Sequence, residues 1–168
     1  MDTIQLIQHG SLWGLLFGGT FCAAILILGR INAEMLINDY PPDIRAKAGP
    51  MSSGARKQAS LASIPLLLAL TAVIVLALHQ LRQAEGGLTL PSTFVVVTVM
   101  LQVWNLIDLV ILDWLILMTL RPAFMIVPGT AGYHDYRFHF HKFLNGIVLT
   151  LILSGIITLV ALGMELVF

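Results

Sequence analysis

The stretch that decides the fold is QVWNLIDLVILDW, residues 102–114, inside the apolar run 94–120. Four polar side chains interrupt it: Gln102, Asn105, Asp108 and Asp113. With Thr98, they fall within an arc of roughly 140° on a helix of 100° per residue. A carboxylate that faces lipid costs several kcal/mol. We therefore expect residues 94–120 to form a membrane-spanning helix whose polar stripe faces the interior of a bundle.

The composition is that of a protein solvated by lipid. Charged residues make up 11% of the 168 residues and apolar residues 58%, whereas a typical soluble domain is about 25% charged. The 9 basic residues balance the 9 acidic ones, which gives no reason to expect nucleic acid as a partner. The single cysteine, Cys22, excludes a disulfide within the chain.

Four apolar runs reach the length of ~20 residues that a bilayer core requires. They cover residues 12–37, 61–81, 94–120 and 143–167. The first run is too long for the apolar part of a cleaved signal peptide, and no Lys or Arg precedes it. We predict one all-α domain over residues 1–168, a bundle of four transmembrane helices.

The basic residues outside these runs predict the orientation. The first and third connections contain Arg45, Lys47, Arg56, Lys57, Arg121, Arg137 and Lys142, whereas the second contains only Arg82. Because cytoplasmic loops are enriched in Lys and Arg, both long loops should be cytoplasmic. We expect an N-out/C-out protein of the cell (inner) membrane.

Small residues recur at a spacing of four in the first and fourth runs. The first stripe is Gly10, Gly14 and Gly18, and the second is Gly146, Thr150, Ser154 and Thr158. Such stripes let helices approach closely in lipid. We expect the two stripes to pack against each other, and a homodimer seam is the rival use of the glycine stripe.

Matching the depths of the helices predicts partners for the charged residues. Arg30 and Asp113 lie at similar depths, so an ion pair between them would allow both to be buried. Asp108 lies ~18 Å from the inner boundary, near Thr71 and Ser154, where no cation is expected. It is either a protonatable site or a hydrogen-bonding residue that holds helices together through Asn105 and Ser154. Glu34 is one turn from Arg30 and either shares it or reaches the histidines described next.

The stretch YHDYRFHFHK, residues 133–142, contains the second group of closely spaced polar residues. Its possible metal ligands are His134, Asp135, His139 and His141, and a divalent metal such as zinc or iron is the one cofactor that they suggest. Asp113 and Glu34 could complete such a site. The spacing matches no known metal motif, and there is no HExxH. The interleaved aromatic residues favour an interfacial belt, in which His139 or His141 relays protons to Asp113.

Three classes of function fit these patterns. The favoured one is a ligand-binding or accessory membrane subunit, whose binding residues would be Arg30, Glu34, Asn105, Asp108 and Asp113. The second is a membrane enzyme that acts on a lipid or quinone-like substrate, with Asp113, His139 and Glu34 as catalytic candidates. The third is a proton- or ion-coupled carrier that uses Asp108. The expected partners are bilayer lipids, and further copies of the chain or a larger membrane complex remain open.

Overall fold

A computed structural model describes residues 1–127, 129–130 and 135–166 of the protein. These residues form helices and no strands. In chain order the helices are α1 (Thr3–Asn32), η1 (Ala33–Asp39), α2 (Pro42–Ala48), α3 (Ser53–Glu85), α4 (Leu90–Ile107), η2 (Asp108–Leu120), η3 (Ala123–Met125) and α5 (Tyr136–Glu165).

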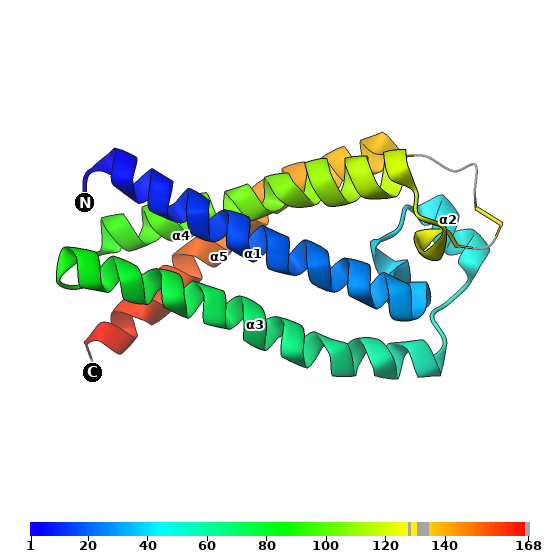
Figure 1. The fold of residues 1–168 in the computed structure, drawn as a ribbon, viewed down its shortest axis with the longest axis horizontal. Coiled ribbons are helices and arrows are strands. Elements are labelled where there is room, and N and C mark those ends of the chain that lie inside the picture. The colour runs from blue at the N-terminus through cyan, green and yellow to red at the C-terminus, as the bar shows by residue number, and fades with distance from the viewer. Residues whose placement is uncertain (128, 131–134, 167–168) are drawn as a thin grey trace.

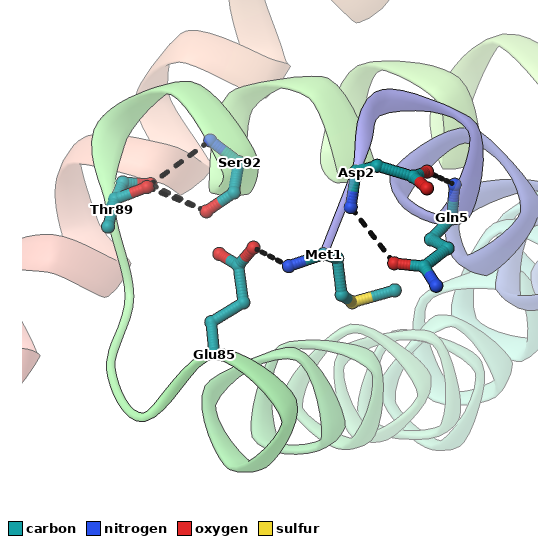
Figure 2. Close-up of polar contacts among 6 residues, drawn as sticks. All are labelled: Met1, Asp2, Gln5, Glu85, Thr89 and Ser92. Atoms are coloured by element: carbon teal, nitrogen blue, oxygen red, sulfur yellow. Dashed lines mark hydrogen bonds and ion pairs between the residues drawn. The ribbon is translucent and has the colours of Figure 1, made fainter.

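Four helical segments are long and apolar enough to cross a membrane, which confirms the predicted all-α class. They are Thr3–Asp39, Ser53–Glu85, Leu90–Leu120 and Tyr136–Glu165. Each is longer than its apolar run, because polar residues outside the run cap the helix ends. Asp2 accepts a hydrogen bond from the backbone N–H of Gln5, while the Gln5 side chain accepts one from the backbone N–H of Asp2 (Figure 2).

The two ends of the bundle differ in what they contain. Both chain termini lie at one end, which we call the terminal end, and α2 with the long connections lies at the other, the loop end (Figure 1). At the terminal end the amino group of Met1 lies 3.0 Å from Oε1 of Glu85 (Figure 2). Nε of Arg82 lies 2.8 Å from Oε2 of Glu165. These ion pairs join α3 to the start of α1 and to the end of α5.

Helix α4 lies between α1 and α5, and α3 packs on α1. The glycine stripe of α1 faces α4: a Cβ atom on Gly14 would lie 2.7 Å from Cβ of Val103 and 2.8 Å from the carbonyl oxygen of Met100. The small stripe of α5 also faces α4, where Gly146 contacts Asn105. The predicted packing of the two stripes against each other is therefore wrong, because α4 separates them. The glycine stripe is buried within this chain, so a homodimer seam cannot use it either.

One buried apolar cluster of the core joins α1, α3 and α4. Its buried members are Phe17, Val73, Ala77, Val97, Met100 and Leu101. The opposite face of α3 is exposed and apolar, as the 62% and 67% exposed fractions of Leu67 and Leu68 show. An apolar outer surface is what a helix in contact with lipid requires.

Candidate functional site: a buried ion cluster beside an apolar cavity

The polar stripe continues from α4 into a π-helix. Along η2 the backbone N–H of residue i+5 bonds the carbonyl of residue i, and the N–H of Arg121 extends this pattern with a 2.8 Å bond to Ile116. Because this pattern brings residues five apart close to the same side, Asp108 and Asp113 point toward one partner helix. The angular spacing of an α-helix would separate them by roughly 140°.

The stripe faces α5, which confirms that it points into the bundle. Nε2 of Gln102 donates to the carbonyl of Ile147 over 3.2 Å. Nδ2 of Asn105 donates to the carbonyl of Phe143 over 3.1 Å. Each bond gives a side-chain amide of α4 a backbone acceptor on α5, so this part of the stripe has a structural explanation.

The two carboxylates meet basic side chains of α5. Nδ1 of His139 lies 2.9 Å from Oδ2 of Asp113, and the two side chains are 1% and 3% exposed. Nζ of Lys142 lies 3.4 Å from Oδ2 of Asp108 and 3.9 Å from Oδ2 of Asp113. We call Asp108, Asp113, His139 and Lys142 the buried ion cluster. Because a buried charge requires a partner, the carboxylates of η2 depend on these side chains of α5.

The predicted ion pair between Arg30 and Asp113 is wrong. Arg30 is exposed, and its guanidinium lies over the ring of Phe124, 5.4 Å from the ring centre. Asp113 is directed instead toward α5. The π-helix sets the direction of the Asp113 side chain, and depths along regular α-helices do not predict this direction.

The expectation that no cation reaches Asp108 is also wrong. It assumed that the last helix begins near Phe143, whereas α5 begins at Tyr136 and includes Lys142. The proposed hydrogen bond from Ser154 to Asp108 is absent as well, because the Ser154 hydroxyl donates to the carbonyl of Thr150 over 2.7 Å.

Glu34 lies apart from the cluster. Its carboxylate accepts hydrogen bonds from the backbone N–H and the hydroxyl of Ser52, the latter over 3.0 Å. Ser52 in turn caps α3. Glu34 therefore connects η1 to the start of α3, and among the described residues it pairs with neither Arg30 nor His139 nor His141.

The histidine stretch is largely helical. His139 and His141 belong to the first turns of α5, and Asp135 caps this helix by accepting from the N–H of Phe138 over 2.9 Å. His141 is exposed, and its Nδ1 lies 2.7 Å from the carbonyl oxygen of Arg137. His134 lies outside the described residues. Within the part of the chain that the structure describes, no three His, Cys, Asp or Glu residues are placed to hold a metal ion. The metal site stays a prediction that depends on His134.

A cavity of about 70 Å³ lies beside the buried ion cluster at the loop end. Its walls are mostly apolar side chains from α1, η1, α2, η2 and η3. The polar residues that line it are Asp39, Tyr40, Asp108, Asp113, Arg121, Thr130, His139 and Lys142. Asp39, Tyr40 and Thr130 were not predicted from the sequence as residues of the site, and Arg121 and Lys142 were used only to predict the orientation. The fold alone brings these residues together, since they come from η1, from α5 and from the segments that follow η1 and η2.

Tyr40 joins the wall of the cavity to η3. Its hydroxyl donates to the carbonyl of Met125 over 2.6 Å. Burial raises the pKa of Tyr40 to about 12, and the neighbouring carboxylate of Asp39 adds to the rise. The phenol is therefore neutral over the physiological range and serves as a hydrogen-bond donor.

Three buried polar atoms of the cluster have no hydrogen-bond partner among the described residues. They are Oδ1 of Asp108 and both ring nitrogens of His139. Nδ1 of His139 is close to Asp113 without forming a hydrogen bond, whereas Nε2 has no charged partner among these residues either. Unsatisfied buried polar atoms are rare in native structures and call for an explanation. Both residues line the cavity, so a molecule inside it would be near these side chains.

Comparison with known proteins gives no match: no family model, no curated protein and no solved structure is significantly similar to this chain.

Proposed function

We propose that this chain is a multi-pass protein of the cell (inner) membrane that binds the polar head of a membrane-dissolved molecule in the cavity beside the buried ion cluster. The observation that carries this proposal is the combination of a mostly apolar cavity with unpartnered polar atoms on Asp108 and His139, which line it. Ligand sites are typically apolar clefts with a few convergent polar groups.

The distribution of cations supports an N-out/C-out orientation. Both termini lie at the terminal end (Figure 1), and the loop end includes α2 with Arg45 and Lys47. Because Lys and Arg are retained on the cytoplasmic side, the loop end is assigned to the cytoplasm. The cavity then opens near the cytoplasmic boundary of the bilayer, where an amphipathic molecule places its polar head.

The size of the cavity limits what it can hold. A volume of about 70 Å³ exceeds that needed for one water molecule, but it is less than the ~150 Å³ of a cavity that accommodates benzene. The cavity therefore takes a head group and not a whole lipid. The apolar part of the ligand would lie against the helices or in the surrounding lipid.

Photolabelling with an alkyl diazirine analogue of decanol tests this proposal. Leu117 lines the cavity, whereas Leu115, on the same π-helix, is 43% exposed. Leu117→Trp should fill the cavity and abolish saturable labelling of its walls, while Leu115→Trp should leave that labelling unchanged. Labelling confined to lipid-facing residues such as Leu67 and Leu68, or labelling that Leu117→Trp does not reduce, contradicts the proposal.

A proton-coupled carrier is the second candidate, because buried hydroxyl groups continue from the cluster toward the terminal end. Thr98, Thr93 and Thr158 lie on α4 and α5, and their Oγ1 atoms have no hydrogen-bond partner among the described residues. Carboxyl groups inside membrane proteins serve in proton relays, and these hydroxyl groups would extend a relay from Asp108 toward the terminal end. Proton flux into liposomes, followed with a pH-sensitive dye, should then be lost in both Asp108→Asn and Thr158→Val. A flux in the original protein no larger than that of empty liposomes, or a flux that neither substitution reduces, excludes this candidate.

A further inference from the structure

The described charges around the cavity favour a cationic ligand. The carboxylates that line it are those of Asp39, Asp108 and Asp113, and the cations are Arg121 and Lys142. While His139 is neutral, the wall is one unit more negative than positive. In a site with mostly apolar walls, such an excess favours the entry of a positive charge.

The cluster already holds a primary ammonium group in the form of Lys142. Its distances of 3.4 and 3.9 Å to the two carboxylates are longer than the roughly 2.8 Å of a strong charge-assisted hydrogen bond. The Lys142 side chain is 38% exposed, whereas that of Asp113 is 3% exposed. Lys142 therefore lies at the edge of the site, and a second ammonium group could replace it without breaking a short bond.

The unpartnered atoms of Asp108 and His139 can accept hydrogen bonds from a ligand. Oδ1 of Asp108 accepts hydrogen bonds, and Nε2 of neutral His139 accepts one when its proton is on Nδ1, the nitrogen beside Asp113. A primary ammonium group has three N–H donors and no acceptor. A primary ammonium group therefore has enough donors for a carboxylate and an imidazole together, whereas an ionised carboxylate ligand has no donor for either.

We propose that the cavity binds the primary ammonium group of an apolar amine, held by Asp108 and His139 in competition with Lys142. This inference rests on the proposed function, since it names the head group that the cavity receives. The ammonium group has two sources with the same chemistry: a phospholipid with an ethanolamine head, or a free long-chain amine.

Matched alkyl diazirine probes with amine, alcohol and carboxylate heads test the inference on the full-length protein in lipid nanodiscs. The amine should label the cavity walls at lower concentration than the other two. Lys142→Met should strengthen amine labelling by about tenfold, if Lys142 occupies the site for about nine-tenths of the time. The same change should leave alcohol labelling nearly unaltered. Asp108→Asn should weaken amine labelling and spare alcohol labelling.

The possible results separate this inference from the proposed function. One result is that the alcohol probe labels the cavity as strongly as the amine probe, and Lys142→Met changes the labelling by neither. The proposed ammonium ligand is then contradicted, whereas ligand binding in the cavity is supported. If no probe labels the cavity, both proposals fail. If Asp108→Asn does not fold, the amine labelling of Lys142→Met still tests the inference. A purely structural role for Lys142 predicts no increase in amine labelling in that variant.

Competition then identifies the source of the ammonium group. Unlabelled decylamine and a short-chain phosphatidylethanolamine are added separately, with the matching phosphatidylcholine as the control. Displacement of the amine probe by decylamine alone, or by phosphatidylethanolamine as well, supports the inference and names the source. Displacement by phosphatidylcholine to the same extent overturns it, because that head has no N–H donor.

Discussion

Nζ of Lys142 lies within 4 Å of both Asp108 and Asp113, at 3.4 Å from Oδ2 of the first and 3.9 Å from Oδ2 of the second. One ammonium group thus lies between two carboxylates that are five residues apart. The π-helix makes this arrangement possible, because residues at this spacing come close to the same side only when the helix is widened. π-helical segments occur frequently at functional sites, and here the widened segment lines the cavity.

The buried contact between Asp113 and His139 gives a prediction about stability. His139→Leu should destabilise the protein by about 3–5 kcal/mol, because it removes the closest partner of a buried carboxylate. The double variant Asp113→Leu/His139→Leu should recover most of this loss, since two apolar side chains replace the pair. Thermal unfolding in detergent measures both effects. A double variant less stable than His139→Leu would show that the pair stabilises the protein through more than mutual neutralisation.

The close contact of α1 with α4 gives a second prediction, with a matched control on the same helix. Gly14→Ala should destabilise the bundle by about 1–3 kcal/mol, because its Cβ would meet Cβ of Val103 and the backbone of α4. At Gly19 no atom lies within 4 Å of an added Cβ, so Gly19→Ala should be neutral or stabilising by up to ~1 kcal/mol. Equal unfolding temperatures of the two variants would contradict this packing.

Tyr40 gives a prediction about pH. Its pKa is raised from 10.0 to about 12 in the folded protein, so the unfolded chain releases this proton first as the pH rises. The contribution of Tyr40 to stability is therefore fully present below pH 10, and it is lost between pH 10 and about 12. The loss should be roughly 3 kcal/mol, the equivalent of this rise in pKa, and it is measured as the unfolding temperature against pH.

Tyr40→Phe is the control for the titration of other groups over the same pH range. It should cost about 1 kcal/mol at neutral pH, through the lost hydrogen bond to Met125. It should also show a smaller decline of stability above pH 10. An identical decline in the variant and the original protein would assign the effect to residues other than Tyr40.

The sequence allowed the helical class and the inward direction of the polar stripe to be predicted, because few residue types can face lipid. Asn105 and Asp113 are buried as expected. The same argument cannot say which neighbouring helix the stripe faces. Burial of a carboxylate requires a partner, but a single sequence does not identify the helix that provides it.

The partners in the site were mispredicted for two physical reasons. An α-helical spacing was applied to η2, where π-helical bonds rotate Asp113 toward the side of Asp108. The start of α5 was placed at its first long apolar run, whereas the Asp135 cap extends the helix to Tyr136. Lys142 was therefore counted as a loop cation, although it contacts both buried carboxylates.

The central claim is that the cavity binds a ligand beside His139. The nitrogen chemical shifts of the His139 ring, measured with and without a ligand, test this claim most directly. The protein is labelled with ¹⁵N at histidine in lipid bilayers, and the ring resonances are assigned with His139→Gln. Addition of decanol or decylamine should shift the Nε2 resonance of His139, because the ligand gives this atom its missing partner. The exposed His141 should not shift and serves as the internal reference. A His139 resonance that neither compound moves, at concentrations that saturate the bilayer, would contradict ligand binding in this cavity.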